Sequence, residues 1–185
     1  MAKKKKQVKS LLPIIIVAGA AIVALVVAFL LPGVTKTVEG QIFGGQTVYT
    51  IALTGLIFGN GPDVAQSGNT TLSTVYEGGM STFALISFIV MLAGILALVA
   101  SVFVEGKFLD VIGSLLVAVS GVLMLFVLSG GTEVVTDLIG SLQSTKPFIE
   151  YFEGYTLAGG PVIYAIIAII GGAFGIVNNF VKIIK

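Results

Sequence analysis

The sequence predicts an all-α transmembrane four-helix bundle that carries a small extracellular antiparallel β-sheet between its first and second helices. Three observations support this fold class: four long apolar runs, lysines gathered beside some of those runs, and a long alternating segment between the first two. Hydrophobic residues make up 56% of the chain and charged residues only 10%, whereas an ordinary soluble domain is roughly one quarter charged. A length of 185 residues suits one domain.

The four apolar runs are residues 11–31, 82–104, 108–129 and 160–181, and none has a charged residue deep inside it. A helix of this length, rising about 1.5 Å per residue, covers a hydrocarbon core roughly 30 Å thick. Only helices and closed barrels satisfy their backbone groups in lipid, and barrel strands would alternate and be about half as long. The runs therefore predict four membrane-spanning helices.

The first run follows five lysines and could be mistaken for a secretory signal. Its apolar stretch is longer than the roughly 7 to 15 residues of such a signal, and it ends in Leu31-Pro32-Gly33 without a small-residue cleavage site. We expect it to remain in the protein as a membrane anchor.

The distribution of lysine predicts the orientation, because cytoplasmic loops of membrane proteins carry an excess of lysine and arginine. With the N-terminal residues 1–10 inside, the turn at 105–107 and the tail at 182–185 are also cytoplasmic. Eight lysines against Glu105 and Asp110 then give +6 inside, and two lysines against seven acidic residues give −5 outside. The basic anchor itself is favoured as a topology determinant over a site for anionic lipid headgroups; it comprises Lys3, Lys4, Lys5, Lys6 and Lys9.

The extracellular segment 32–81 changes from an apolar to an alternating pattern. Residues 36–43 and 47–54 alternate on either side of Gly44-Gly45, which indicates a β-hairpin. A turn-rich stretch at 59–63 separates them from a third short strand at 71–76, so we expect three strands. One face of the second strand carries Tyr49, Ile51 and Leu53. Packing of this stripe on the helix ends is favoured over a candidate interaction surface for a partner, and both are compatible.

The second extracellular segment, 130–159, has helical spacing instead. Its apolar residues between 134 and 142 predict a helix lying on the membrane. Four aromatic residues then follow at positions i, i+3, i+4 and i+7, which predicts an interfacial aromatic belt on one helical face, in preference to a ligand site: Phe148, Tyr151, Phe152 and Tyr155.

Residues that carry chemistry are scarce. The chain has no Cys, His, Arg or Trp, which excludes disulfides and thiolate metal sites and argues against a metal or acid–base enzyme. Asp110 begins the third run beside Lys107, where a helix-start carboxylate is expected. We expect the span serines Ser87, Ser101 and Ser114, like Ser120, to bond carbonyls of their own helices. No catalytic, cofactor-binding or metal-ligating residue is predicted.

Glycines within the fourth run predict close helix packing, because small residues let membrane helices approach each other. Gly171 and Gly175 are four residues apart and lie on one helical face. Whether the neighbouring helix belongs to the same chain or to another is left open.

The order of the segments resembles that of the claudin and peripheral-myelin-protein class of tetraspan proteins. Val48-Tyr49 and Gly55-Leu56-Ile57 fall roughly where that class has its first-loop Gly-Leu-Trp, but the tryptophan and both family cysteines are absent. The resemblance implies a similar shape, an extracellular sheet resting on a left-handed four-helix bundle. It does not imply the barrier function, for which the family disulfide is missing.

These observations predict a non-enzymatic multi-pass protein of the cell membrane that acts as a scaffold, adhesion protein or accessory subunit. Its expected partners are the lipid bilayer and other membrane proteins or further copies of itself, with no nucleic acid and no cofactor. An oligomeric pore for small solutes is the alternative, and an enzyme ranks third. Lysine as the sole basic residue type is typical of AT-rich bacterial genomes and indicates a bacterial source.

Overall fold

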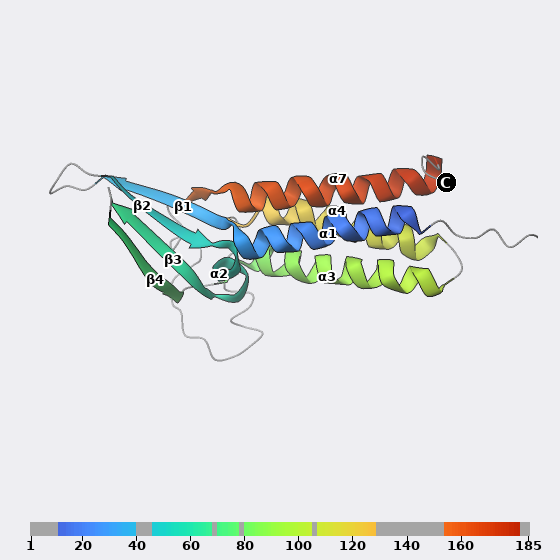
Figure 1. Ribbon diagram of the computed structural model, residues 1–185, viewed down its shortest axis with the longest axis horizontal. Coiled ribbons are helices and arrows are strands. Elements are labelled where there is room, and N and C mark those ends of the chain that lie inside the picture. The colour runs from blue at the N-terminus through green and yellow to red at the C-terminus, as the bar shows by residue number, and fades with distance from the viewer. Residues whose placement is uncertain are drawn as a thin grey trace, which may run out of the picture.

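The computed structural model describes residues 11–39, 46–67, 70–77, 80–104, 107–128 and 154–181. Within these ranges, four long helices run side by side and a β-sheet continues from one end of them (Figure 1). We call the two ends of the bundle the sheet end and the turn end. The turn end is the end at which one long helix stops at Phe103 and the next begins at Phe108.

Each of the four predicted apolar runs forms one helix, and each helix is long and apolar enough to cross a membrane. Their bounds are α1 Leu12–Leu30, α3 Thr82–Phe103, α4 Phe108–Leu125 and α7 Gly159–Val181. The third helix is shorter than its run, because α4 gives way to a turn at residues 126–128. The predicted fold of four apolar helices with a small antiparallel sheet is confirmed.

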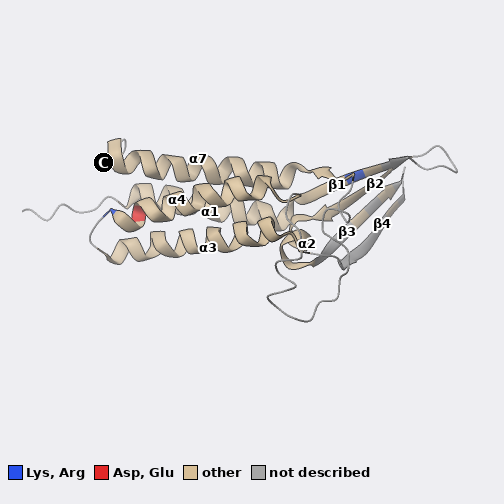
Figure 2. Ribbon diagram, turned by 180° about the vertical axis from the view of Figure 1, so that it is seen from behind, with Lys and Arg blue, Asp and Glu red and all other residues tan. Residues whose placement is uncertain are grey.

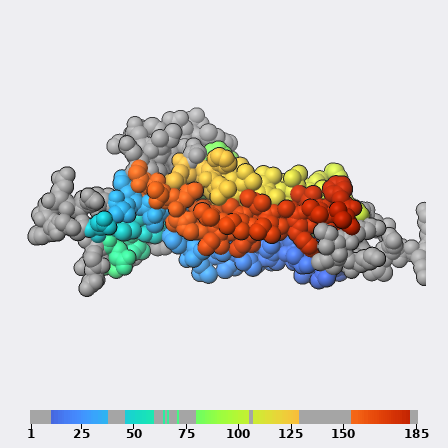
Figure 3. Space-filling model, turned by 90° about the horizontal axis from the view of Figure 1, so that it is seen from above, coloured from blue at the N-terminus to red at the C-terminus, as the bar shows by residue number. Residues whose placement is uncertain are grey.

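Three helix pairs form the main seams of the bundle: α3 with α4, α4 with α7, and α1 with α7. Seen from above, α7 lies between α1 and α4 (Figure 3). Helices α1 and α3 touch much less, and so do α1 and α4. The core lies along the three close seams, where residues such as Val17, Met91 and Val117 are almost completely buried.

Local sequence sets where the helices begin. Pro13 lies in the first turn of α1, where its missing N–H removes no helical hydrogen bond. Ser81 caps α3: its Oγ accepts the N–H of Ala84 at 3.3 Å. The same hydroxyl donates to the carbonyl of Val127 at 2.6 Å, so it also ties α3 to the chain that leaves α4.

The sheet is antiparallel and its strand order is β4-β3-β2-β1-β5. Its strands are β1 Pro32–Glu39, β2 Gln46–Ala52, β3 Asn60–Ser67, β4 Thr70–Glu77 and β5 Thr156–Leu157. The predicted hairpin corresponds to β1 and β2, and the third predicted strand to β4. The sequence predicted three strands, whereas the sheet has five, because β3 and β5 are strands as well.

The strand β3 occupies the stretch that its Gly, Asn and Pro content had marked as turns. Pro62 is tolerated there because the ladder between β2 and β3 ends at the pair Ile51–Asp63 and does not extend to Pro62, the residue that precedes Asp63. The N–H that Pro62 lacks is therefore not needed for pairing with β2. Beyond Asp63, β3 pairs only with β4.

A short helix, α2 Leu53–Phe58, joins the sheet to the bundle. It ends at Gly59, whose φ of 76° is left-handed and favours glycine. Leu53, Leu56 and Ile57 are all fully buried. The second predicted strand therefore stops at Ala52, and Leu53 belongs to α2 rather than to a strand face.

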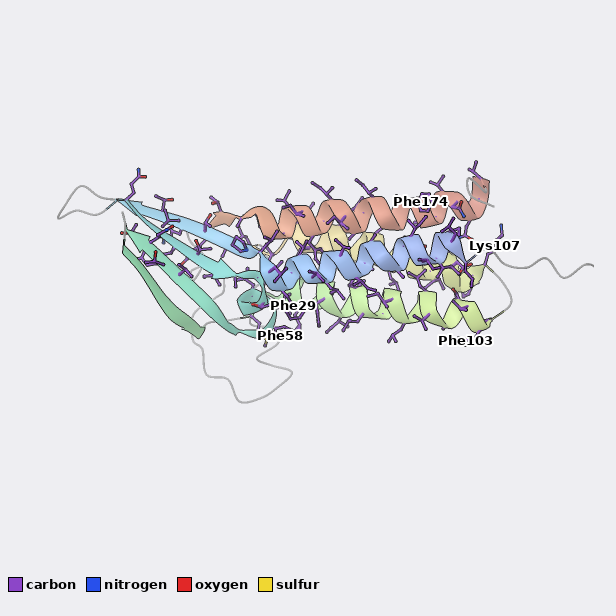
Figure 4. All side chains as sticks on the ribbon, in the orientation of Figure 1. Phe29, Phe58, Phe103, Lys107 and Phe174 are labelled. Carbon is purple, nitrogen blue, oxygen red and sulfur yellow. The ribbon has the colours of Figure 1, made fainter. Side chains whose placement is uncertain are left out.

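Three phenylalanines close the sheet end between α1 and α3. The ring centroid of Phe58 lies 5.4 Å from that of Phe88 and 6.4 Å from that of Phe29, and the rings of Phe29 and Phe88 are also 6.4 Å apart. Phe29 and Phe58 point toward each other where α1 meets α2 (Figure 4). Their contact supports the sheet end of the α1–α3 pair, which touches much less than the three main seams do.

The chain enters α7 through β5, which pairs with β1 at Val34 and Thr35. Tyr155 precedes β5 as irregular backbone, and Gly154 before it has a φ of 79°. The prediction that a helix continues to Tyr155 was therefore wrong, because pairing with the edge of β1 overrides the helical spacing of the aromatic residues. The rest of that predicted helix and belt, including Phe148, Tyr151 and Phe152, lies outside the described residues.

Candidate functional site

The two predicted packing glycines lie at helix contacts within the chain. A Cβ added to Gly171 would lie 2.5 Å from the Cβ of Ala20 in α1, and one added to Gly175 would collide with the Ser114 side chain in α4 and lie 2.7 Å from Val17 in α1. Both glycines thus face neighbours in their own bundle.

Four further glycines have the same role, which the sequence analysis missed. Added Cβ atoms at Gly94 and Gly113 would lie 3.1 and 3.0 Å from each other's carbonyl oxygen, across α3 and α4. Between α4 and α7, a Cβ on Gly121 would lie 2.9 Å from the Ala165 carbonyl oxygen, and one on Gly172 would lie 2.5 Å from the Ser114 carbonyl oxygen. Gly113 faces α3 and Gly121 faces α7, so these two glycines of one run mark two different packed faces of α4.

A cluster of hydroxyl groups joins three helices inside the bundle. The Ser87 hydroxyl of α3 donates to the Ser120 carbonyl of α4 at 2.7 Å, and its Oγ lies 3.5 Å from the Tyr164 Oη of α7. All three residues are fully buried. The prediction for Ser120 is confirmed, since its Oγ bonds the Val117 carbonyl at 2.7 Å, and Ser101 likewise bonds Leu98 at 2.6 Å. The same prediction was wrong for Ser87, because the Ser87 hydroxyl donates to a carbonyl of another helix, α4.

The cluster is a means of packing rather than a site for a substrate. The Ser87 and Ser120 hydroxyls donate to backbone carbonyls of α4, and fully buried side chains are not open to a solute. Tyr164 was overlooked in the sequence because one tyrosine in an apolar run carries no periodic signal.

Charged residues of the described chain lie at its two ends (Figure 2). At the turn end, the Lys107 ammonium donates to the Asn179 carbonyl at 2.8 Å, which satisfies the C-terminal turn of α7. The Asn179 side chain donates to the Gly175 carbonyl at 2.9 Å. Asp110 lies in the first turn of α4, as predicted, and is only 5% exposed. The Lys107 contact therefore fastens the start of α4 to the end of α7.

At the sheet end, Lys36 holds the chain that precedes α7. Its ammonium lies 5.4 Å from the centre of the Tyr155 ring, a cation–π contact. Thr35 and Thr156 add a second tie: the Thr156 hydroxyl donates to the Thr35 carbonyl at 3.3 Å. The segments on both sides of the α3–α4 pair therefore meet in one sheet.

One face of this sheet is lined by threonines. In an antiparallel sheet, residues directly opposite each other share a face, and the pairing aligns Thr37, Val48, Gln66 and Thr71 in one row across four strands. Three of these are exposed and Val48 is half-buried. A second row runs parallel to it. We call this surface the threonine face: Thr35, Thr37, Thr50, Thr71, Thr156, Gln66, Val48 and Val64.

The opposite face holds the predicted stripe, and most of it is not available to a partner. Ile51 is 2% exposed and packs in the core with Val34, while Leu53 is fully buried in α2. Tyr49 is half-buried. The candidate interaction surface of Tyr49, Ile51 and Leu53 was therefore wrong for Ile51 and Leu53, whose apolar side chains fill the junction between sheet and bundle. The favoured alternative, packing at the helix ends, describes them.

The basic anchor formed by Lys3, Lys4, Lys5, Lys6 and Lys9 lies outside the described residues. Among the residues that the structure does describe, no group of three or more His, Cys, Asp or Glu side chains is placed to hold a metal ion. A scan against protein-family models and a search of the curated proteins both found no match. The candidate site is therefore defined by geometry alone, and it is the sheet with its threonine face.

Proposed function

We propose that this chain is a non-enzymatic multi-pass membrane protein that serves as a scaffold, adhesion protein or accessory subunit through its sheet. The four helices cross the membrane, the sheet lies outside the cell, and both termini lie in the cytoplasm. The lysine distribution supports this orientation.

One observation carries the proposal: a five-stranded sheet built onto the bundle, with an exposed polar face. Val34 and Ile51 of the sheet and Leu56 of α2 are buried in the same apolar core as residues of the long helices, so this sheet is packed onto the bundle. Ordering that much backbone costs conformational entropy, on the order of 1 kcal/mol per residue. A rigidly held surface of this kind suits recognition of a partner, since preorganisation lowers the cost of binding.

The pore alternative receives less support from the described helices. Their hydroxyl groups Ser87, Ser120 and Tyr164 are buried within one chain. The exposed side chains of the helices that could contact another copy are largely apolar; they include Leu96, Ile170 and Phe180. A water-filled path between subunits would need polar residues there. Flux measurements on proteoliposomes at high protein loading test this alternative, and leaky vesicles would revive it.

Crosslinking in native membranes tests the proposal. The chain contains no cysteine, so a single Gln66→Cys variant places one photoreactive maleimide probe in the middle of the threonine face. Ile170→Cys is the matched control, because Ile170 is 65% exposed on an apolar helix. We expect Gln66→Cys to label a defined protein that Ile170→Cys does not. Identical sets of neighbours from both positions would refute the proposal.

A further inference from the structure

The two edges of the sheet differ, and the difference extends the proposed function, on which this inference rests. The edge beyond β1 is partly occupied by the chain's own β5. Lys36 also lies on β1, and edge lysines are a common protection against pairing with another chain. At the other edge is β4, which pairs with β3 alone within the described part of the chain.

The strand β4 is regular along its whole length. All eight of its residues pair with β3 in one unbroken register, from Ser67–Thr70 to Asn60–Glu77. Its sequence, TTLSTVYE, contains no Pro, Gly or Lys, and no bulge interrupts it. Within the residues that the structure describes, β4 therefore has neither the proline, the lysine nor the bulge that commonly protects an edge strand.

The register also indicates which backbone groups of β4 face away from β3. Two residues separate Ser67 from Thr70, and the pair that closes a two-residue hairpin is normally hydrogen-bonded. Alternation then turns the N–H and C=O of Thr70 and every second residue toward β3. Those of Thr71, Ser73, Val75 and Glu77 point the other way. Pro62, opposite Val75, fits this assignment, since its nitrogen would face β2 beyond the end of that ladder.

We propose that β4 is a docking edge for an extended segment of another membrane protein, which adds a sixth strand to the sheet. A row of unpaired backbone donors and acceptors is matched by an extended backbone and by little else. Seven of the eight residues of β4 are uncharged and Glu77 lies at its bundle-proximal end. The matching segment is therefore uncharged and β-forming, with a Lys or Arg opposite Glu77.

A second copy in the same membrane fits this edge less well. The strand β4 is inclined to the long helices (Figure 1), so a two-fold axis normal to the membrane would set two β4 strands at an angle of twice that inclination. Neighbouring strands of a sheet differ in direction by only about 20–25°, so the two strands would cross instead of pairing along their length.

The test compares probes at the two edges of one row. Thr71→Cys on β4 and Thr37→Cys on β1 replace exposed threonines of the same threonine-face row, and each carries a photoreactive maleimide in native membranes. We expect Thr71→Cys to label one segment of a partner protein that has the stated composition, at least about tenfold more than Thr37→Cys does. Adding Ser73→Pro, which removes one outward N–H without touching the β3 ladder, should reduce that labelling about tenfold. Ser73→Ala, which keeps the N–H, should not.

Each other outcome overturns the inference. If Thr71→Cys labelled residues 129–153 of its own chain or a second copy, the proposal that another membrane protein occupies the β4 edge would be wrong. If labelling survives Ser73→Pro, the sheet binds its partner without strand addition, and the proposed function stands alone. If no sheet position labels a protein, both fail. Circular dichroism shows whether Ser73→Pro folds; should it not, Ser73→Lys provides the edge-blocking variant.

Discussion

The glycine seams predict a large asymmetry between two alanine substitutions. A Cβ at position 172 would lie 2.5 Å from the Ser114 carbonyl oxygen and 2.6 Å from the Ala118 nitrogen, and both are backbone atoms of α4 that cannot rotate away. A Cβ at Gly19 would meet nothing within 4 Å. Both glycines lie inside helices of the bundle, so the two substitutions add the same methyl group and differ only in the room available around it.

We expect Gly172→Ala to destabilise the bundle by about 2–3 kcal/mol, because overpacking typically costs 1–3 kcal/mol and here α4 and α7 must move apart. Gly19→Ala should be neutral or stabilise by up to about 1 kcal/mol, since alanine is the better helix former. The free energy of unfolding, measured by circular dichroism in mixed micelles titrated with a denaturing detergent, should therefore differ by about 3 kcal/mol between the variants.

The reasoning would be refuted if Gly172→Ala unfolded at the same detergent fraction as Gly19→Ala. A loss of stability in Gly19→Ala would also contradict it, because it would show α1 packed against a surface that the described chain does not contain. Gly159→Ala serves as a second control, since its Cβ would have only the Ile163 Cδ1 at 3.8 Å.

Three further substitutions test the other contacts. Tyr164→Phe removes the hydroxyl beside Ser87 and should lower the free energy of unfolding by about 0.5–1.5 kcal/mol in the same titration; no change would mean that the cluster contributes nothing. Lys36→Met removes the cation–π contact with Tyr155, worth about 0.5–1 kcal/mol, and should speed amide hydrogen exchange at residues 155–157; unchanged exchange would contradict it. Ser81→Ala removes both a helix cap and a donor and should cost about 1–2 kcal/mol, whereas Ser81→Thr should retain most of that stability.

The helices could be predicted from sequence because their signal is local. Each apolar run is long enough to specify a span by itself, and pairing with other segments changes its ends by only a few residues, as at Leu125 in α4. The antiparallel pair of β1 and β2 was equally readable from its alternation.

The sheet was harder to predict because it depends on partners distant in sequence. The strand β3 has a composition typical of turns, and its pairing with β2 and β4 decides its structure. Tyr155 shows the same limit. The spacing of the aromatic residues predicted a helix there, but the next residues of the chain pair with β1, which lies more than a hundred residues away in the sequence. Leu53 continued an alternating pattern but ends up in α2, where burial at the junction outweighs the pattern.

The candidate site was predicted only in its location. The alternating segment pointed to the sheet, but it suggested the wrong face, since apolar residues such as Ile51 mark the side that packs on the bundle. The threonine face has no apolar stripe to mark it. Its rows became visible only once the register of four strands was known.

The central claim is that the helices cross a membrane with the sheet outside and the turn end inside. Single cysteines in this cysteine-free chain test it on intact cells with a membrane-impermeant maleimide. Thr37→Cys on the sheet should be labelled at once, and Lys107→Cys at the turn end only after the membrane is permeabilised. Labelling of Lys107→Cys alone, or of both variants without permeabilisation, would contradict the account.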